Sequence, residues 1–229
     1  KNKIFFRREK NRTGIFLTET GYNEKNNPAG GPAMITAYPA PCFPTSVHTS
    51  RIGASDNPDV LSPLRLRALL RDASRAASPV RYRHMPPVIL CIGTDRIIGD
   101  CLGPLAGSMI KKAAGEHLPV YGTLEHTVHA LNLSAISQEI KKKHHGQIMI
   151  AVDASLGSYE HIGSVFVRPG CLRPGAGVRK KLPGVGDIAI TGIANGESSS
   201  PYLDLQTARL STISRMAEMI CDCILDACF

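Results

Sequence analysis

Short apolar runs and helically spaced apolar residues follow one another along most of the chain. The run at 87–93 is continuous, which is typical of a strand covered on both faces. Largely apolar runs at 118–124, 147–155, 163–170 and 187–193 predict four further strands. Apolar residues recur at helical spacing between and beside these runs, at 62–78, 101–115, 129–145 and 203–227. Strands joined by helices in this way predict an α/β domain with a mostly parallel sheet between helical layers.

The first quarter of the chain has a different composition. Runs rich in Pro, Gly and Asn occupy 26–33 and 38–46, and no apolar period is sustained there. We therefore expect residues 1–57 to form a disordered or loosely ordered tail and residues 58–229 to form the folded domain. The tail is basic, because seven Lys and Arg against three Glu in residues 1–33 supply +4 of the net charge of +8.

Charge, hydropathy and cysteine content narrow the class of protein. The remaining charge is ordinary and no nucleic-acid-binding motif is present, although an electrostatic role for the tail stays open. No apolar run approaches the roughly 20 residues that span a bilayer. The seven cysteines include no CxxC pair, which favours reduced thiols over disulfides or structural zinc. We expect a cytoplasmic protein.

Two aspartates occupy the positions where chemistry is expected in such a sheet. Asp153 directly follows the apolar run 148–152. An acid at the end of a central parallel strand rarely has a structural role, so a functional one is favoured. Asp100 follows the strand that Gly93 closes and lies where the next helix begins, so it could also be a helix N-cap. Because ligands bind at the carboxyl ends of parallel strands, we expect both carboxyls at one sheet edge.

Paired carboxyls at one edge fit the hydrolysis of an amide bond. One can stay ionised and activate water while the other donates a proton. The same pair can instead hold a divalent metal that generates hydroxide. The residues alone leave both mechanisms open.

Further residues are candidates for accessory or substrate-binding roles. His129 starts the helix predicted over 129–145 and could assist proton transfer, although a lone His near a helix start is more often a solvated or capping residue. Asp95 shares the loop of Asp100 and is expected to line the cleft. Thr191 and Asn195 could donate hydrogen bonds to a developing oxyanion. Arg179, in a Gly- and Pro-rich loop that lacks a phosphate-loop pattern, could bind an acidic peptide or simply be solvated.

Five ordered motifs carry a resemblance to a known family over about residues 60–227. The chain closely resembles the YyaC family of sporulation proteins, which is similar to the spore germination protease and to hydrogenase maturation endopeptidases. The motifs are GTDRIIGDCLGP at 93–104, YGTLEHTVHALN at 121–132, IAVDASLG at 150–157, PGAGVRKKLPGVGDIAITGIANG at 174–196 and LQTARL at 205–210.

The resemblance implies a fold, a site and an activity. The fold is a three-layer α/β/α sandwich of the phosphorylase/hydrolase-like type with a mostly parallel central sheet. The acids critical in the germination protease match Asp100 and Asp153, whereas the His that helps hydrogenase maturation enzymes bind nickel has no evident match. The implied function is a spore-associated endopeptidase that cleaves a spore protein or a precursor in the forespore or spore interior.

The expected partner is thus a protein or peptide substrate, and the oligomeric state is not specified. No cofactor is predicted, with a divalent metal as the open alternative. Two other functions remain: a catalytically silent sporulation protein that binds a protein partner, and a metal-dependent amide hydrolase.

Overall fold

The structure is a computed structural model that describes residues 9–10, 16–17, 59–76, 85–174 and 184–229. The chain divides into two compact units, 1–51 and 52–229. In the first unit, β1 (Glu9–Lys10) and β2 (Phe16–Leu17) pair antiparallel, which the sequence pattern did not predict. The rest of the tail predicted over residues 1–57 lies outside the described residues.

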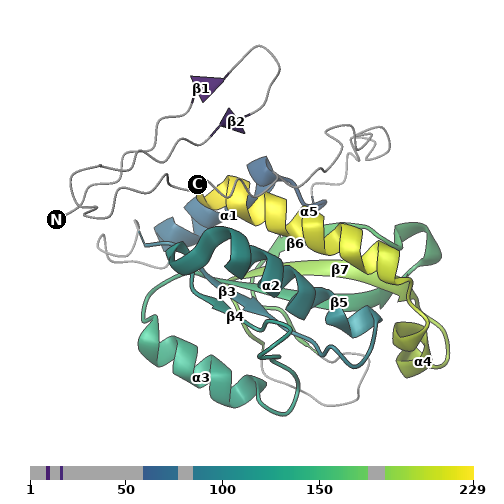
Figure 1. Cartoon of the computed structure of the whole chain (residues 1–229). Coiled ribbons are helices and arrows are strands. Elements are labelled where there is room, and N and C mark those ends of the chain that lie inside the picture. Colours follow the sequence, from purple (N-terminus) through teal and green to yellow (C-terminus); the bar gives the residue numbers. More distant parts are fainter. Residues whose placement is uncertain (1–8, 11–15, 18–58, 77–84, 175–183) are drawn as a thin grey trace, which may run out of the picture. The chain divides into compact units, whose positions relative to one another are not determined.

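The second unit is built on a five-stranded sheet with the order β4-β3-β5-β7-β6. Neighbouring strands are parallel except for β6, which runs antiparallel to β7 at one edge. Figure 1 shows the sheet in the middle of this unit. Its strands are β3 (Val88–Cys91), β4 (Val120–Tyr121), β5 (Met149–Gly157), β6 (Val165–Pro169) and β7 (Ile188–Gly196).

Helices cover both faces of this sheet (Figure 1). One apolar cluster joins α1 (Pro63–Ala76), α2 (Leu102–Ala114) and α5 (Leu210–Cys228) to one face. A smaller cluster joins α3 (Leu133–Lys143) to the other face. This arrangement confirms the predicted three-layer α/β/α class with a mostly parallel sheet. Among the helices of the described residues, none combines the length and the apolar character that a bilayer span requires.

Two predicted boundaries are wrong, and both errors concern the edge of the sheet that carries the aspartates. Strand β5 extends past the predicted end at residue 155, because β7 goes on pairing with it as far as Gly157. The helix predicted over 203–227 is two helices, α4 (Pro201–Gln206) and α5. Between them Arg209 is extended, so α4 ends after less than two turns, and the Thr207 hydroxyl just after it donates to the Leu203 carbonyl.

Helix α2 approaches the end of β3 closely because it has glycine where it faces the strands. A Cβ added to Gly103 would lie 2.0 Å from the Ile92 carbonyl oxygen, and one added to Gly107 would lie 2.1 Å from the Gly122 carbonyl oxygen. Real Cβ atoms do not approach backbone atoms so closely, so any larger residue would push the helix away. The start of α2, and with it Asp100, is therefore held against the sheet edge.

We predict that Gly103→Ala destabilises the domain by roughly 2 kcal/mol, because overpacking against backbone outweighs the better helix propensity of Ala. The matched control is Gly157→Ala at the end of β5, where the backbone has no positive φ and an added Cβ meets only the flexible Ile193 side chain, at 3.2 Å. That variant should cost at most about 1 kcal/mol, because a side chain can shift where backbone cannot. Denaturant unfolding of both variants measures the difference, and equal losses would contradict the close approach.

Candidate active site

The candidate site lies where β3 stops and β5 continues. Ile92, just after β3, donates its N–H to the Val152 carbonyl at 2.8 Å, so Asp153 lies beside the chain as it leaves β3. A Cβ added to Gly93 would lie 2.0 Å from the Asp100 carbonyl oxygen, so the Asp100 backbone passes directly over Gly93. The two predicted aspartates thus meet at one edge of the sheet, from different elements.

Asp100 is held by the loop that connects β3 to α2. It lies inside a 3-10 turn, η3 (Gly99–Cys101), and its carbonyl accepts a hydrogen bond from the Thr94 N–H at 3.2 Å. The N-cap position of α2 is Cys101, with no side-chain capping bond. The alternative interpretation of Asp100 as the N-cap of this helix is therefore wrong, and its carboxyl is available for another role.

Asp153 is the more deeply buried of the two acids, with 8% of its surface exposed. One carboxyl oxygen, Oδ1, accepts a hydrogen bond from the Ala154 N–H at 2.9 Å. Burial raises the pKa of Asp153 well above 3.8, and the neighbouring charge of Asp100 raises it further, while the Ala154 N–H opposes both. This environment favours the protonated form of Asp153 more strongly than water does.

Burial also raises the pKa of Asp100, but here two groups work against it. A hydrogen bond from the Thr94 backbone and the nearby His129 both lower this pKa. Asp100 is consequently the more easily ionised acid of the pair. Two carboxyls within each other's field hold one proton between them over a range of pH, with the proton favoured on Asp153.

His129 lies at the same sheet edge as Asp100, held through its backbone. The preceding residue, Val128, accepts a hydrogen bond from the Gly93 N–H at 2.8 Å. Asn132 fixes the turn, because its Oδ1 accepts from the His129 N–H at 2.8 Å and its Nδ2 donates to the Thr127 carbonyl at 2.9 Å. This side-chain bridge also explains why α3 begins at Leu133 and not at residue 129.

The ring of His129 has a defined orientation. Its Nδ1 accepts a hydrogen bond from the Leu131 N–H at 3.3 Å. In the neutral ring the proton then resides on Nε2, which leaves Nε2–H as the donor. His129 was predicted as an accessory residue, and the structure brings it into the electrostatic neighbourhood of Asp100.

The other predicted residues have separate places. Thr191 is the β7 register partner of Asp153, directly beside it. Asn195 is turned to a structural bond, because its Nδ2 donates to the Asp204 carbonyl of α4 at 2.8 Å. Asp95 is exposed and lies within 3.5 Å of the Thr94 hydroxyl. Arg179 lies outside the described residues, and the role predicted for each of these four residues stays a prediction.

Cys101 follows Asp100 directly and is not an activated thiol. Burial raises its pKa, and the charges of Asp100 and Asp95 raise it further. A nucleophilic cysteine needs the opposite shift, toward the thiolate at neutral pH. The site thus offers carboxyls rather than a thiol for chemistry.

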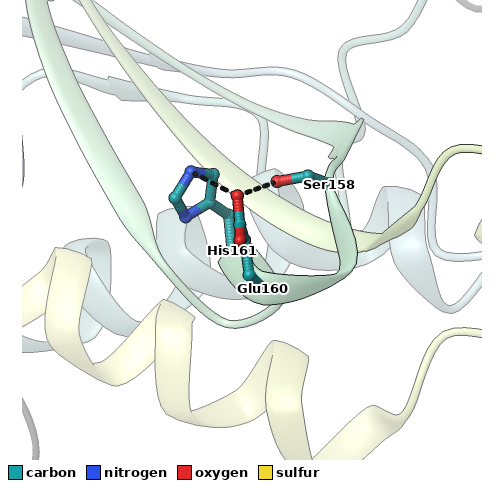
Figure 2. Close-up of polar contacts among 3 residues, drawn as sticks. All are labelled: Ser158, Glu160 and His161. Carbon is teal, nitrogen blue, oxygen red and sulfur yellow. Dashed lines mark hydrogen bonds and ion pairs between the residues drawn. The ribbon is translucent and has the colours of Figure 1, made fainter.

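A serine, an acid and a histidine also lie together in the turn that follows β5, as Figure 2 shows. The Glu160 carboxylate accepts from the Ser158 hydroxyl at 3.3 Å and lies 3.8 Å from Nε2 of His161. In a hydrolytic triad the imidazole lies between the hydroxyl and the acid, so that it can take the proton of the hydroxyl. Here the acid lies in the middle and all three side chains are exposed, so this group is a surface cluster.

Among the residues that the structure describes, no group of three or more His, Cys, Asp or Glu side chains could hold a metal ion. Asp100 and Asp153 could supply two oxygen ligands of the type that hard divalent cations prefer.

Three comparisons relate the chain to known proteins. A family model described as "Protein of unknown function (DUF1256)" matches residues 68–223. The chain is also similar to the Uncharacterized protein YyaC of Bacillus subtilis (strain 168), with 40% identity over 164 residues, which are 72% of this chain and 78% of the relative. Both matches are long enough to define a family.

Among solved structures, the chain is similar to the NiFe hydrogenase maturation protease HycI from Thermococcus kodakarensis KOD1. The TM-score is 0.39 with 16% identity, over 62% of this chain and 93% of that chain. The resemblance to the YyaC family predicted from five motifs is confirmed by the sequence matches, and the chain belongs to the family of proteins described as DUF1256.

Proposed function

We propose that this protein is an endopeptidase that hydrolyses a peptide bond of a protein substrate through Asp100 and Asp153. The observation that carries the proposal is the meeting of two carboxyls from separate elements at the carboxyl edge of a parallel sheet, each with a raised pKa. Strongly perturbed acids at such an edge are more typical of catalytic sites than of structural pairs.

The different environments of the two acids assign their roles. Asp100, the more easily ionised, accepts a proton from water as the water oxygen attacks the carbonyl carbon of the scissile bond. Asp153, protonated, donates to the carbonyl oxygen, so a neutral tetrahedral intermediate forms. When the C–N bond breaks, the leaving nitrogen takes the proton from Asp100 and Asp153 recovers its proton from a hydroxyl of the intermediate.

His129 supports the ionised form of Asp100 in this scheme. Its influence lowers the pKa of Asp100, and the fixed backbone of residues 127–132 holds it near the base. With Nδ1 occupied by the Leu131 N–H, only Nε2 remains to donate a hydrogen bond. His129 therefore serves as a positioning residue for the base.

The resemblance to sporulation proteins supports a substrate among the proteins of the forespore or spore. Two alternatives would use the same carboxyls differently. A divalent metal bound by Asp100 and Asp153 would activate water in place of the free acid–base pair. A protein that only binds a partner would keep the carboxyls without cleaving anything.

We predict that Asp100→Asn and Asp153→Asn each lower cleavage by at least about 10³-fold, since each removes one of two groups that act as a unit. Extract of sporulating cells is incubated with each protein, and new peptide ends are counted by mass spectrometry. The matched control is Glu116→Gln, an exposed carboxyl beyond the end of α2, which should cleave like the wild type.

Identical new peptide ends in all four proteins would refute the paired mechanism. The absence of any new ends with the wild type would favour the partner-binding alternative. A chelator in the same assay distinguishes the acid–base mechanism from the metal-dependent one, because the acid–base mechanism predicts unchanged cleavage. Loss of cleavage with the chelator, reversed by added Mn²⁺ or Zn²⁺, would favour the metal-dependent hydrolase.

We also predict that Asp153→Asn is more stable to unfolding than the wild type at pH 7. A carboxyl whose pKa is raised in the folded state favours folding at pH values below its pKa in the unfolded chain, near 3.8. This contribution to stability is lost as the pH rises through the pKa of the folded state. Asn keeps an acceptor for the Ala154 N–H but never ionises. Thermal unfolding of both proteins is measured from pH 3.5 to pH 8. The advantage in Tm of Asp153→Asn over the wild type should grow with pH. An advantage that shrinks between pH 3.5 and pH 7 would contradict the prediction.

A further inference from the structure

Helix α4 contributes little to the core, yet it is firmly attached beside Asp100. None of its residues is buried. A Cβ added to Gly99 would lie 2.8 Å from the Leu205 carbonyl oxygen, so α4 packs directly on the residue that precedes Asp100. Leu205 packs half-buried against the core, whereas the other large apolar side chains of the helix stay exposed.

Polar side chains anchor this helix from the end of β7. The Asn195 amide donates to the Asp204 carbonyl at 2.8 Å, and the Ser198 hydroxyl donates to the Asp204 carboxylate at 2.8 Å. The Ser198 N–H donates to the same carboxylate at 2.9 Å. These bonds fix α4 at the end of strand β7, where Figure 1 shows it.

Two large apolar side chains of α4 are exposed beside this site. Tyr202 is 59% exposed and Leu203 is 56% exposed, and Ile98, next to Gly99 in the chain, is 41% exposed. Exposed large apolar side chains on elements beside a site are candidates for a binding surface. Their elements flank the proposed base, Asp100, because α4 packs on Gly99 through Leu205.

A second apolar element lies on the opposite flank of the aspartates. Leu131, 82% exposed, follows His129 in the loop after β4. The sheet order is β4-β3-β5-β7-β6, so β3 and β5 lie between β4 and β7. The loop with Leu131 follows β4, on one side of them, and α4 follows β7, on the other side. A chain that crosses the carboxyl ends of β3 and β5 would therefore meet apolar side chains before and after the carboxyl pair.

We propose that α4 with Ile98, and Leu131 across from them, form the substrate-binding walls of this site and receive apolar side chains of an extended polypeptide on both sides of the cleaved bond. This inference rests on the proposed peptidase function and adds its substrate class. Asn195 and Ser198 then act as positioning residues, because they hold the α4 wall in place. The substrate is an unfolded or extended segment, since a folded surface would keep its large apolar residues buried.

Binding to the full-length Asp153→Asn variant tests the surface apart from catalysis. The probes are fluorescein-labelled decapeptides that differ only in four central residues, Leu in one and Ser in the other, and fluorescence anisotropy gives Kd. We expect the Leu peptide to bind at least tenfold more tightly than the Ser peptide. Adding Tyr202→Ser and Leu203→Ser to Asp153→Asn should weaken the Leu peptide about fivefold or more and leave the Ser peptide unchanged.

The matched control is Leu64→Ser on α1, which removes an even more exposed apolar side chain, 79% exposed, from another part of the domain. It should leave both affinities unchanged. Equal binding of the two peptides, or an equal loss in the Leu64 control, would overturn the proposal. Discrimination by the α4 wall without cleavage by the wild type would uphold the surface and overturn the peptidase function instead, so the two failures are distinguishable.

Discussion

The contact between the Asp100 backbone and Gly93 is the constraint on which the site depends. A residue with a side chain could not occupy position 93, because its Cβ would meet the Asp100 carbonyl at 2.0 Å. The loop after β3 must therefore fold back over the strand end, and the glycines of α2 let the helix follow at the same close range. Asp153, on the neighbouring strand, is then buried within electrostatic reach of Asp100.

This arrangement of two buried acids lowers the stability of the fold but suits acid–base chemistry. Burying two acids near each other raises both pKa values, which disfavours ionisation in the folded state. Structural pairs usually join opposite charges, and no Lys or Arg among the described residues contributes to the pKa shift of either acid. The difference between the acids, set by Thr94 and His129 acting on Asp100 alone, gives the pair one favoured donor and one favoured base.

Much of the fold followed from the sequence because its strands are continuous apolar runs. The run from Ile148 to Val152 has no polar residue because both faces of its strand are buried. The apolar run therefore predicted both the strand and its burial. Asp153 stood out as the first charge after that run. The sequence pattern did not predict that β5 continues to Gly157, since this part of the strand depends on pairing with β7 rather than on local apolar character.

The roles of His129 and α4 show what local patterns miss. His129 appeared to begin a helix, but the Asn132 side chain makes a separate turn there, and His129 lies within electrostatic reach of Asp100. Helix α4 was merged with α5 because their apolar spacing is continuous, whereas Arg209 between them is extended. The bonds of Asn132 are local but involve a side chain that an apolar pattern does not register, and the approach of α4 to Gly99 joins segments distant in sequence, so neither segment alone predicts it.

The central claim is that Asp100 and Asp153 form one electrostatic unit. NMR titration of the Asp153 side-chain carboxyl carbon, in the wild type and in Asp100→Asn, tests it directly. We predict a pKa well above 3.8 in the wild type that falls when Asp100 is neutralised, yet stays raised because Asp153 remains buried. An Asp153 carboxyl that titrates at the same pH in both proteins, or near 3.8 in the wild type, would contradict the account.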